Sequence, residues 1–543
     1  MNRIILFFLL MLSSSSHAQS NGEAEQKLLN KPKLVVGIIV DQMRYDFLFR
    51  YWDKYSTGGF KRMIEEGYLC RNVHYDYIPT YTGPGHASVY TGTTPSVHGI
   101  VSNDWFDRET GKTMYCVSDS SVKGVGGGSK MAPRNLFTTT IPDELRLASK
   151  MQSKVIGIAL KDRGAILPAG HSANAAYWID ASGNWVSSSY YMQNLPLWVN
   201  DFNKRNLQAE YLSQPWKTVL PIEQYTESTA DNNTFEEPFL TEVKPVFPHN
   251  LPVIHKADAD LLKRTPFGNT MTKEFALATI KGEELGHHEV TDFICISFSS
   301  TDYVGHQFGI DAIETEDTYL RLDRDLSELV MFLDKWVGKD NLLVFLTADH
   351  GAAHNSEYLK AQKIPAGVID GQKLNKLLTS LLDTLYGKGK YISVISSHDI
   401  YLNNKEIAEK KVNRKALIES IKTFLLSTAG IADVATAEEL MGLQQNNSQR
   451  EMLRAGMNSL RAADIYFTLK PQWMDYNLTG TTHGSGYDYD THVPLLFWGG
   501  KISTGFSEEY HSITDIAPTV CTYLNISFPS GCTGKIITEI FQK

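Results

Sequence analysis

The sequence lacks the features of several protein classes, and each absence narrows the function. After residue 18 it contains no apolar run long enough to cross a bilayer as a helix. It also has no excess of positive charge, since 52 Lys and Arg stand against 61 Asp and Glu, a formal net charge of -9. Because a nucleic-acid surface needs many cations to neutralise phosphates, we expect no nucleic-acid partner. A small anionic substrate remains compatible with this charge if a local cluster of cations receives it.

Cysteine is scarce as well. The chain has five cysteines, and none has the CxxC spacing of a thiolate metal site. Cys521 and Cys532 are close enough in sequence to form a disulfide, and Cys70 with Cys116 is a weaker possibility. Cys295 lies inside a run that reads as a buried strand. The cysteines therefore indicate little about the chemistry.

Residues 1–18 have the pattern of a signal peptide. Arg3 supplies the positive start, residues 4–12 the apolar core, and residues 16–18 the small-x-small cleavage pattern. The apolar core is too short for a stable anchor. We therefore expect a mature chain that begins near Gln19, is periplasmic or secreted, and has no stable membrane insertion.

Several apolar runs rich in strand formers end directly before polar residues. The runs and the polar residues that follow them are 33–40 with Asp41, 154–160 with Lys161 and Arg163, 292–298 with Asp302 and His306, and 342–347 with Asp349 and His350. Continuous apolar runs of this length indicate buried parallel strands. In an open α/β sheet, ligands bind beyond the carboxyl ends of the strands, so chemistry is expected at these polar residues.

The same pattern predicts the architecture. We expect an α/β fold with a doubly wound, mostly parallel sheet flanked by helices and carrying inserted cap segments. Residues 19–543 are read as a single domain. One insertion is expected at about 180–290, packed over the site, and a smaller α+β insertion at about 371–468.

A threonine is expected at the start of a helix near residue 82. Pro84 suits the first turn of a helix, because its missing N–H would be unpaired there. This places Thr82 where free N–H groups and the helix dipole favour an anion. Thr80 competes for the same role, and the helix start favours Thr82. Asn103 follows in the loop at residues 101–105.

The strand ends and one later loop offer three carboxylates and three imidazoles. They are Asp41, Asp302, Asp349, His306, His350 and His483. Asp302 and His306 have the four-residue spacing that brings both to one side of a helical turn. Nitrogen and oxygen ligands without thiolates suit two zinc ions better than magnesium. Each residue taken alone could instead be a helix cap or a solvated charge. The agreement among several strand ends argues against these simpler interpretations.

These residues, taken in order, resemble the pattern of the alkaline phosphatase superfamily. The most telling segments are residues 161–163, 300–306 and 348–354. Within the superfamily the chain looks like the flavobacterial phosphate-irrepressible alkaline phosphatases, which use a threonine nucleophile. The resemblance runs from Lys33 to about Pro529.

The resemblance implies a role for each residue. One zinc would be held by Asp41, Asp349, His350 and Thr82, and the other by Asp302, His306 and His483. Asn103, Lys161 and Arg163 would bind the phosphate oxygens, as their donor geometry also suggests. The implied enzyme is an exported, monomeric hydrolase of small-molecule phosphate monoesters. It would act through a covalent phosphothreonine intermediate and a zinc-bound hydroxide.

Two other functions stay open. The first is a phosphodiesterase or nucleotide pyrophosphatase on the same scaffold, which would have the same zinc ligands. Lys161 and Arg163 argue against it, because two cations favour the dianion of a phosphate monoester. An exported zinc- or phosphate-binding protein without catalysis is disfavoured by the intact nucleophile and ligands. A sulfatase is disfavoured because the chain has no Cys-x-Pro-x-Arg segment.

Overall fold

The computed structural model describes residues 31–396, 398–443 and 448–541, so the predicted signal peptide lies outside the described residues. Its main element is a sheet of ten strands in the order β18-β2-β17-β10-β1-β9-β6-β7-β8-β5. The five strands from β10 to β7 run parallel to one another. Their bounds are β10 (Leu342–Thr347), β1 (Leu34–Val40), β9 (Asp292–Phe298), β6 (Val155–Ala159) and β7 (Ala175–Ile179).

The outer strands run in mixed directions. β17 is antiparallel to β10, β2 is antiparallel to β17, and β18 is parallel to β2. At the other end β8 is antiparallel to β7 and β5 is antiparallel to β8. The bounds are β17 (His492–Gly499), β2 (Tyr68–His74), β18 (Gly505–Ser512), β8 (Trp185–Ser188) and β5 (Gly124–Val125).

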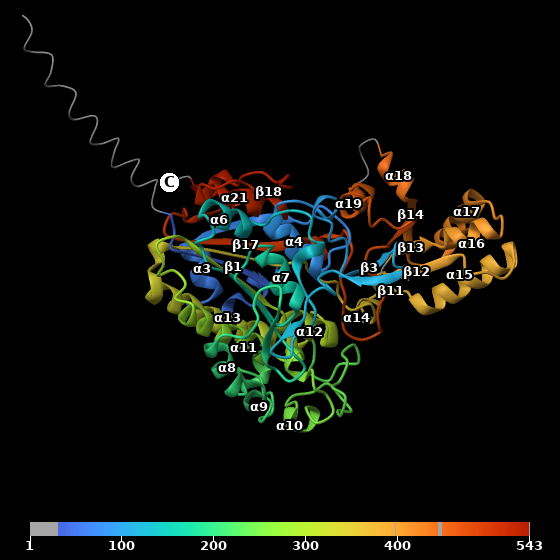
Figure 1. Cartoon of the computed structure of the whole chain (residues 1–543). Coiled ribbons are helices and arrows are strands. Elements are labelled where there is room, and N and C mark those ends of the chain that lie inside the picture. Colours follow the sequence, from blue (N-terminus) through green and yellow to red (C-terminus); the bar gives the residue numbers. More distant parts are fainter. Residues whose placement is uncertain (1–30, 397, 444–447, 542–543) are drawn as a thin grey trace, which may run out of the picture.

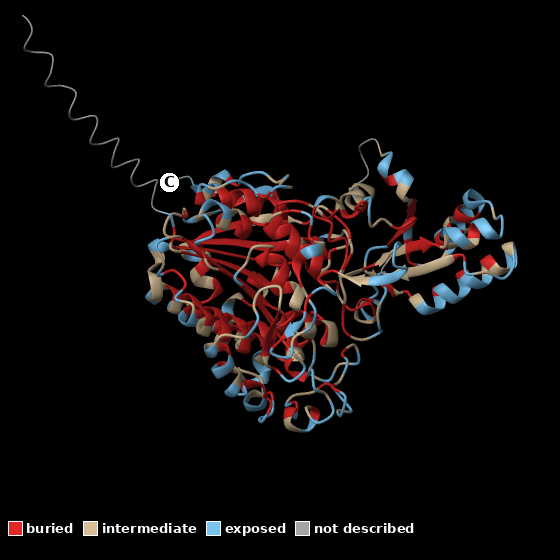
Figure 2. Cartoon of the chain, viewed as in Figure 1, coloured by how far each residue is buried: buried red, intermediate tan, exposed pale blue. Residues whose placement is uncertain are grey.

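Helices cover both faces of the sheet (Figure 1). One layer contains α3 (Phe60–Glu66), α11 (Phe267–Gly282) and α13 (Ile313–Val337), and the other contains α4 (Thr82–Thr91), α6 (Ile141–Ala148), α7 (Asp162–Ala169) and α21 (Ile516–Leu524). Every residue of β1, β9 and β10 is consequently buried, as Figure 2 shows for the centre of the body. The predicted fold class is confirmed. None of the helices in the described ranges is long and apolar enough to cross a membrane.

Close packing at the middle of β1 holds α4 against the sheet. Gly37 lies at this point, and a Cβ added there would come within 2.3 Å of the Tyr90 hydroxyl and 2.6 Å of the Phe345 ring. Tyr90 belongs to α4 and is fully buried. Only glycine leaves room here for the Tyr90 hydroxyl and the Phe345 ring. Gly37 therefore lets α4, whose first residue is Thr82, lie close to the sheet.

Residues 371–469 contain a second, smaller sheet that projects from the main body (Figure 1). Its strand order is β12-β13-β15-β14 and all pairs are antiparallel. The elements are α15 (Gly371–Tyr386), β12 (Ile392–Ser396), β13 (Asp399–Leu402), α16 (Asn404–Glu409), α17 (Arg414–Ser427), β14 (Ile431–Thr436) and β15 (Ile465–Leu469). Leu378, Leu417 and Ile465 are among the residues of its own hydrophobic core. This region therefore combines helices and strands around a core of its own.

The segment at 180–290 contacts the main body through its last helix and through a buried histidine. Its last helix, α11, packs on α13 and β9. His249 is fully buried and its two ring nitrogens lie 3.0 Å from the carboxylates of Glu242 and Glu314. Burial by itself would lower the His249 pKa, but hydrogen bonds to the two carboxylates raise it to about 9. The residue is thus a buried cation that links the segment to α13.

The cysteine pairings considered from the sequence are wrong, because all five cysteines are free thiols. Cys70 lies in β2 in the main core, whereas Cys116 packs in a separate cluster with Trp105. Cys521 is buried in α21, and Cys532 in the following loop is only partly buried. Burial raises the thiol pKa of each of these four residues, so they behave as small apolar side chains.

Candidate active site and metal centre

The carboxyl edge of the parallel strands gathers the predicted polar residues. Asp41 directly follows β1, Lys161 lies two residues after β6, and Asp349 lies two residues after β10. Asp302 is the third residue of α12 (Ser300–Phe308), which begins two residues after β9. His483 arrives from the loop between β16 (Trp473–Met474) and α20 (Asp488–Thr491).

Each of the three histidines is oriented by its own backbone acceptor. The Nδ1 atoms of His306, His350 and His483 lie 2.8, 2.9 and 2.7 Å from the carbonyl oxygens of Thr481, Gly351 and Thr80, respectively. A carbonyl only accepts, so Nδ1 carries the proton and Nε2 keeps its lone pair. That lone pair is the metal-binding position, and a fixed Nδ1–H is the usual support of a metal-ligating histidine.

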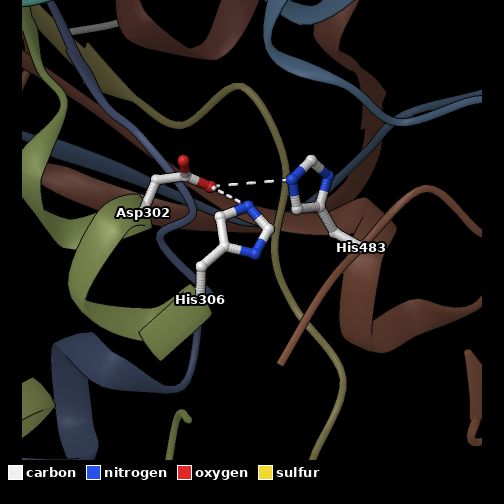
Figure 3. Close-up of side chains that lie close together, drawn as sticks. All are labelled: Asp302, His306 and His483. Atoms are coloured by element: carbon white, nitrogen blue, oxygen red, sulfur yellow. Dashed lines mark ion pairs between the residues drawn. The ribbon is translucent and has the colours of Figure 1, made fainter. Parts of the chain in front are cut away.

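The side chains form two groups with the geometry of metal ligands. One is Asp302, His306 and His483, in which His306 Nε2 and His483 Nε2 point at the same Asp302 oxygen from 3.2 and 3.6 Å (Figure 3). The other is Asp41, Asp302 and His350. Asp302 is therefore shared, whereas the resemblance assigns it to one metal only. Asp349 Oδ2 lies 3.6 Å from His350 Nε2, at the side of the second group.

The second group fits a cation because it contains buried atoms without hydrogen-bond partners. Both oxygens of Asp41, Oδ2 of Asp349 and Nε2 of His350 are buried and receive no well-formed hydrogen bond, although Lys161 Nζ lies 2.6 Å from Asp41 Oδ2 and His86 Nδ1 lies 3.2 Å from Asp349 Oδ2. Burial, with the neighbouring carboxylates, raises the pKa of Asp41, and burial raises that of Asp349 to about 7. Burial also lowers the His350 pKa, which keeps the imidazole neutral. Buried nitrogen and oxygen donors of this kind are compatible with a divalent metal ion such as zinc.

Thr82 lies next to two cations. The Thr82 hydroxyl oxygen is 3.5 Å from both Lys161 Nζ and Arg163 Nη2, and its side chain is 1% exposed. Lys161 Nζ also lies 2.6 Å from Asp41 and 2.5 Å from Asp302. Burial would lower the Lys161 pKa, but these two carboxylates raise it, so the side chain is charged. A threonine hydroxyl and two cationic side chains thus occupy one small volume.

Thr80 and Asn103 have distinct local roles. The Thr80 hydroxyl donates to the carbonyl of Ser485 at 2.9 Å, so it is engaged away from the two cations. Asn103 Oδ1 accepts from the backbone N–H of Gly83 at 2.8 Å, which leaves the Asn103 amide hydrogens to donate at the start of α4. The geometry favours Thr82 over Thr80 as the reacting hydroxyl.

Two supporting residues, Gln42 and Tyr115, were missed by sequence reasoning, and His86 supports the site without being a ligand candidate. Gln42 has a positive φ of 64° and donates through Nε2 to Asp302 at 2.8 Å and through its backbone N–H to Asp349 at 3.1 Å. His86 lies 3.2 Å from Asp349 and 2.9 Å from the carbonyl of Thr82.

Tyr115 holds the side chain of Arg163. Arg163 Nη1 donates to the Tyr115 hydroxyl at 3.2 Å, and that hydroxyl donates to Asp162. Only the position of Gln42 beside Asp41 hinted at any of these roles, because the contacts join residues far apart in sequence.

A buried threonine hydroxyl beside two cations and two imidazole–carboxylate groups defines a hydrolase of phosphate esters. The sequence profile of the family described as type I phosphodiesterase / nucleotide pyrophosphatase matches residues 35–489. Alkaline phosphatase PafA of Elizabethkingia meningoseptica is 44% identical over 96% of this chain and 97% of its own length. Its crystal structure has a TM-score of 0.92 and covers 94% of this chain and 99% of that chain. The chain belongs to the alkaline phosphatase superfamily.

Two further relatives extend over nearly the full length. Alkaline phosphatase PhoV of Synechococcus elongatus is 41% identical over 98% of both chains. A protein of Myroides odoratus that bears the name calcium-transporting ATPase is 45% identical over 95% of this chain and 96% of its own length. The predicted resemblance, and the prediction that the chain is an alkaline phosphatase, are confirmed.

Proposed function

We propose that this chain is an exported, zinc-dependent hydrolase of phosphate monoesters in which Thr82 is the nucleophile. The observation that carries the proposal is the position of the Thr82 hydroxyl, 3.5 Å from both Lys161 Nζ and Arg163 Nη2. A monoester dianion has one more charged oxygen to neutralise than a diester, and two fixed cations supply that neutralisation.

The residues of the chain account for two in-line steps. In the first, the Thr82 oxygen bonds to phosphorus and the bond from phosphorus to the ester oxygen breaks, which leaves a phosphothreonine and an alcohol. In the second, water attacks phosphorus and the Thr82 oxygen leaves with a proton. Arg163 binds phosphoryl oxygens through its planar fork, Lys161 as a point charge and Asn103 as a neutral donor.

Two zinc ions are proposed to complete this site. One would be held by Asp41, Asp349, His350 and Thr82, and the other by Asp302, His306 and His483. When bound, zinc would lower the pKa of the threonine hydroxyl and of water and would offset the charge that develops on the phosphoryl group. The buried Nε2 of His350, which has no hydrogen-bond partner among the described residues, supports this assignment.

Two further observations support the proposal. A solved variant of PafA, 43% identical to this chain with a TM-score of 0.91, carries substitutions of one threonine, one asparagine, one lysine and one arginine. These are the residue types of Thr82, Asn103, Lys161 and Arg163. Export rests on the signal-peptide pattern of residues 1–18.

The test compares an aryl phosphate monoester with an aryl phosphate diester, with zinc present. We expect wild type to prefer the monoester and the Lys161→Ala/Arg163→Ala variant to lose most monoester activity while diester hydrolysis survives. The control is Lys204→Ala/Arg205→Ala, which removes the same two charges at the end of α8 (Leu197–Lys204), where both side chains are largely exposed. A wild-type preference for the diester would instead identify a phosphodiesterase on this scaffold.

A further inference from the structure

Two hollows meet at Tyr303, beside the proposed catalytic residues. A recess of about 230 Å³ is lined by Lys161, Arg163 and Tyr303. A wider cleft of about 610 Å³ is lined by His306 and, again, by Tyr303. Because Tyr303 lines both hollows, it forms the boundary between them. Its ring centre lies 4.9 Å from Lys161 Nζ.

The recess and the cleft differ in charge. Three cations line the recess, Lys161, Arg163 and Lys263, together with the two carboxylates Asp162 and Asp180. Lys161 is also paired with Asp41 and Asp302, and Lys263 with Asp260, so the guanidinium of Arg163 carries most of the attraction for an anion. The charged side chains of the cleft, apart from His306, are Glu237, Asp258 and Arg264. Arg264 is paired with Asp258, which leaves the Glu237 carboxylate as the uncompensated charge. A phosphoryl dianion is attracted to the recess side, and a second anionic group is repelled from the cleft.

The cleft offers ring faces and hydrogen-bonding groups. Tyr476 packs with its ring centre 5.5 Å from that of His306, and its hydroxyl donates to the His306 carbonyl at 3.3 Å. Asn477 and Thr479 also line the cleft, and the Thr479 hydroxyl donates to Glu237 at 2.5 Å. Aromatic faces pack against flat apolar surfaces, while carboxylate and amide oxygens accept from hydroxyl groups.

We propose that this cleft binds the leaving group of the substrate, and that it selects an uncharged ring that bears hydroxyl groups, such as a sugar or a nucleoside. Leaving groups that carry a further phosphate are disfavoured by Glu237. The inference rests on the proposed function. In an in-line displacement the leaving group lies opposite the nucleophile, and the phosphoryl group lies between the two. With the phosphoryl group beside Thr82 and Arg163, two hollows adjoin the metal-ligand candidates, one of about 240 Å³ lined by His483 and one of about 610 Å³ lined by His306. The larger one, next to His306, has the room for a ring and is assigned to the leaving group.

The first experiment uses a matched pair of monoesters, a sugar monophosphate and the corresponding sugar bisphosphate, with the zinc-loaded enzyme. We expect wild type to have the higher kcat/KM for the monophosphate. Glu237→Gln keeps the size and the acceptor for Thr479 but removes the charge. It is expected to raise kcat/KM for the bisphosphate relative to the monophosphate by about three- to fivefold at low salt. The control, Glu409→Gln, removes an exposed charge at the end of α16 and should leave the ratio unchanged.

The second experiment changes the shape of the cleft. Asn477→Trp places a large ring at an exposed position of the wall. It is expected to lower kcat/KM for a nucleoside monophosphate relative to methyl phosphate by about tenfold, because only the nucleoside needs the cleft.

The outcomes separate the two proposals. If wild type hydrolyses the monoesters and neither variant changes its ratio, the cleft does not bind the leaving group and this inference is overturned. If wild type hydrolyses none of the monoesters, the proposed function fails as well. A change in both ratios, with the control unchanged, supports the inference.

Discussion

Gln42 is predicted to fix the positions of the two candidate metal-binding groups relative to each other. It is 2% exposed, and it bonds to Asp302 through its amide and to Asp349 through its backbone N–H. Gly305 leaves the space for it, since a Cβ there would meet the Gln42 amide oxygen at 1.9 Å. The side chain therefore supports a carboxylate that both groups share.

The substitution that isolates this bond is Gln42→Gly. Glycine adopts the observed φ of 64° without strain, so the backbone bond to Asp349 is retained and only the side-chain bond to Asp302 is lost. A hydrogen bond to a charged group contributes about 1.5–3 kcal/mol. At about 1.4 kcal/mol for each factor of ten, zinc affinity should fall by about 10- to 100-fold. Loss of a residue that supports metal ligands typically has an effect of this size.

The assay is equilibrium transfer of zinc from the enzyme to a chromophoric chelator. We expect the variant to release zinc at a lower chelator concentration than wild type. The control is Gln472→Gly, because Gln472 has the same residue type and nearly the same φ, 61°, and is not part of either metal-binding group. Identical release curves for wild type and Gln42→Gly would refute the reasoning.

Three further predictions concern the nucleophile, the pH dependence of stability and the packing of the sheet. Acid quenching during turnover of a phosphate-labelled monoester should trap label on wild type and on Thr80→Ala but not on Thr82→Ala; label retained on Thr82→Ala would contradict the assignment. The stabilisation by His249 should be fully present below pH 6.5 and lost as the pH rises through about 9, because its pKa is raised in the folded chain. In urea unfolding, the difference between wild type and His249→Gln should shrink over that range, and a constant difference would argue against it. Gly37→Ala should destabilise the fold by about 1–3 kcal/mol, through overpacking against Tyr90, and should lower the melting temperature. The control Gly442→Ala should have little effect on the melting temperature, because an added Cβ there meets nothing closer than 3.4 Å.

The parallel strands could be predicted because their signal is local. The run that ends at Asp41 is apolar throughout, and the one before Asp349 is apolar from residue 342 to residue 346, as is typical of a strand buried on both faces. The alignment of parallel strands then brings their carboxyl ends to one edge. For this reason Asp41, Asp302 and Asp349 could be grouped without any knowledge of the contacts between them.

The contacts that orient the site could not be predicted, because they join distant residues. The hydrogen bond between Gln42 and Asp349 spans 307 positions, and that between Gln42 and Asp302 spans 260. Nothing near Tyr115 in the sequence indicates that it holds Arg163. The pairing of Cys70 with Cys116 failed for the same reason, since the two side chains pack in separate hydrophobic clusters.

The sequence by itself determined the sheet, the edge at which polar residues collect and the residue types available for metal and phosphate. Tertiary structure decided which of these residues contact one another. It gave Asp302 to both metal-binding groups, and it directed Thr80 to Ser485 and Thr82 to the two cations. It also placed a cleft that is lined by both Glu237 and His306. Periodicity fixes which face a residue occupies, but only packing of distant segments fixes the few ångströms on which ligation and catalysis depend.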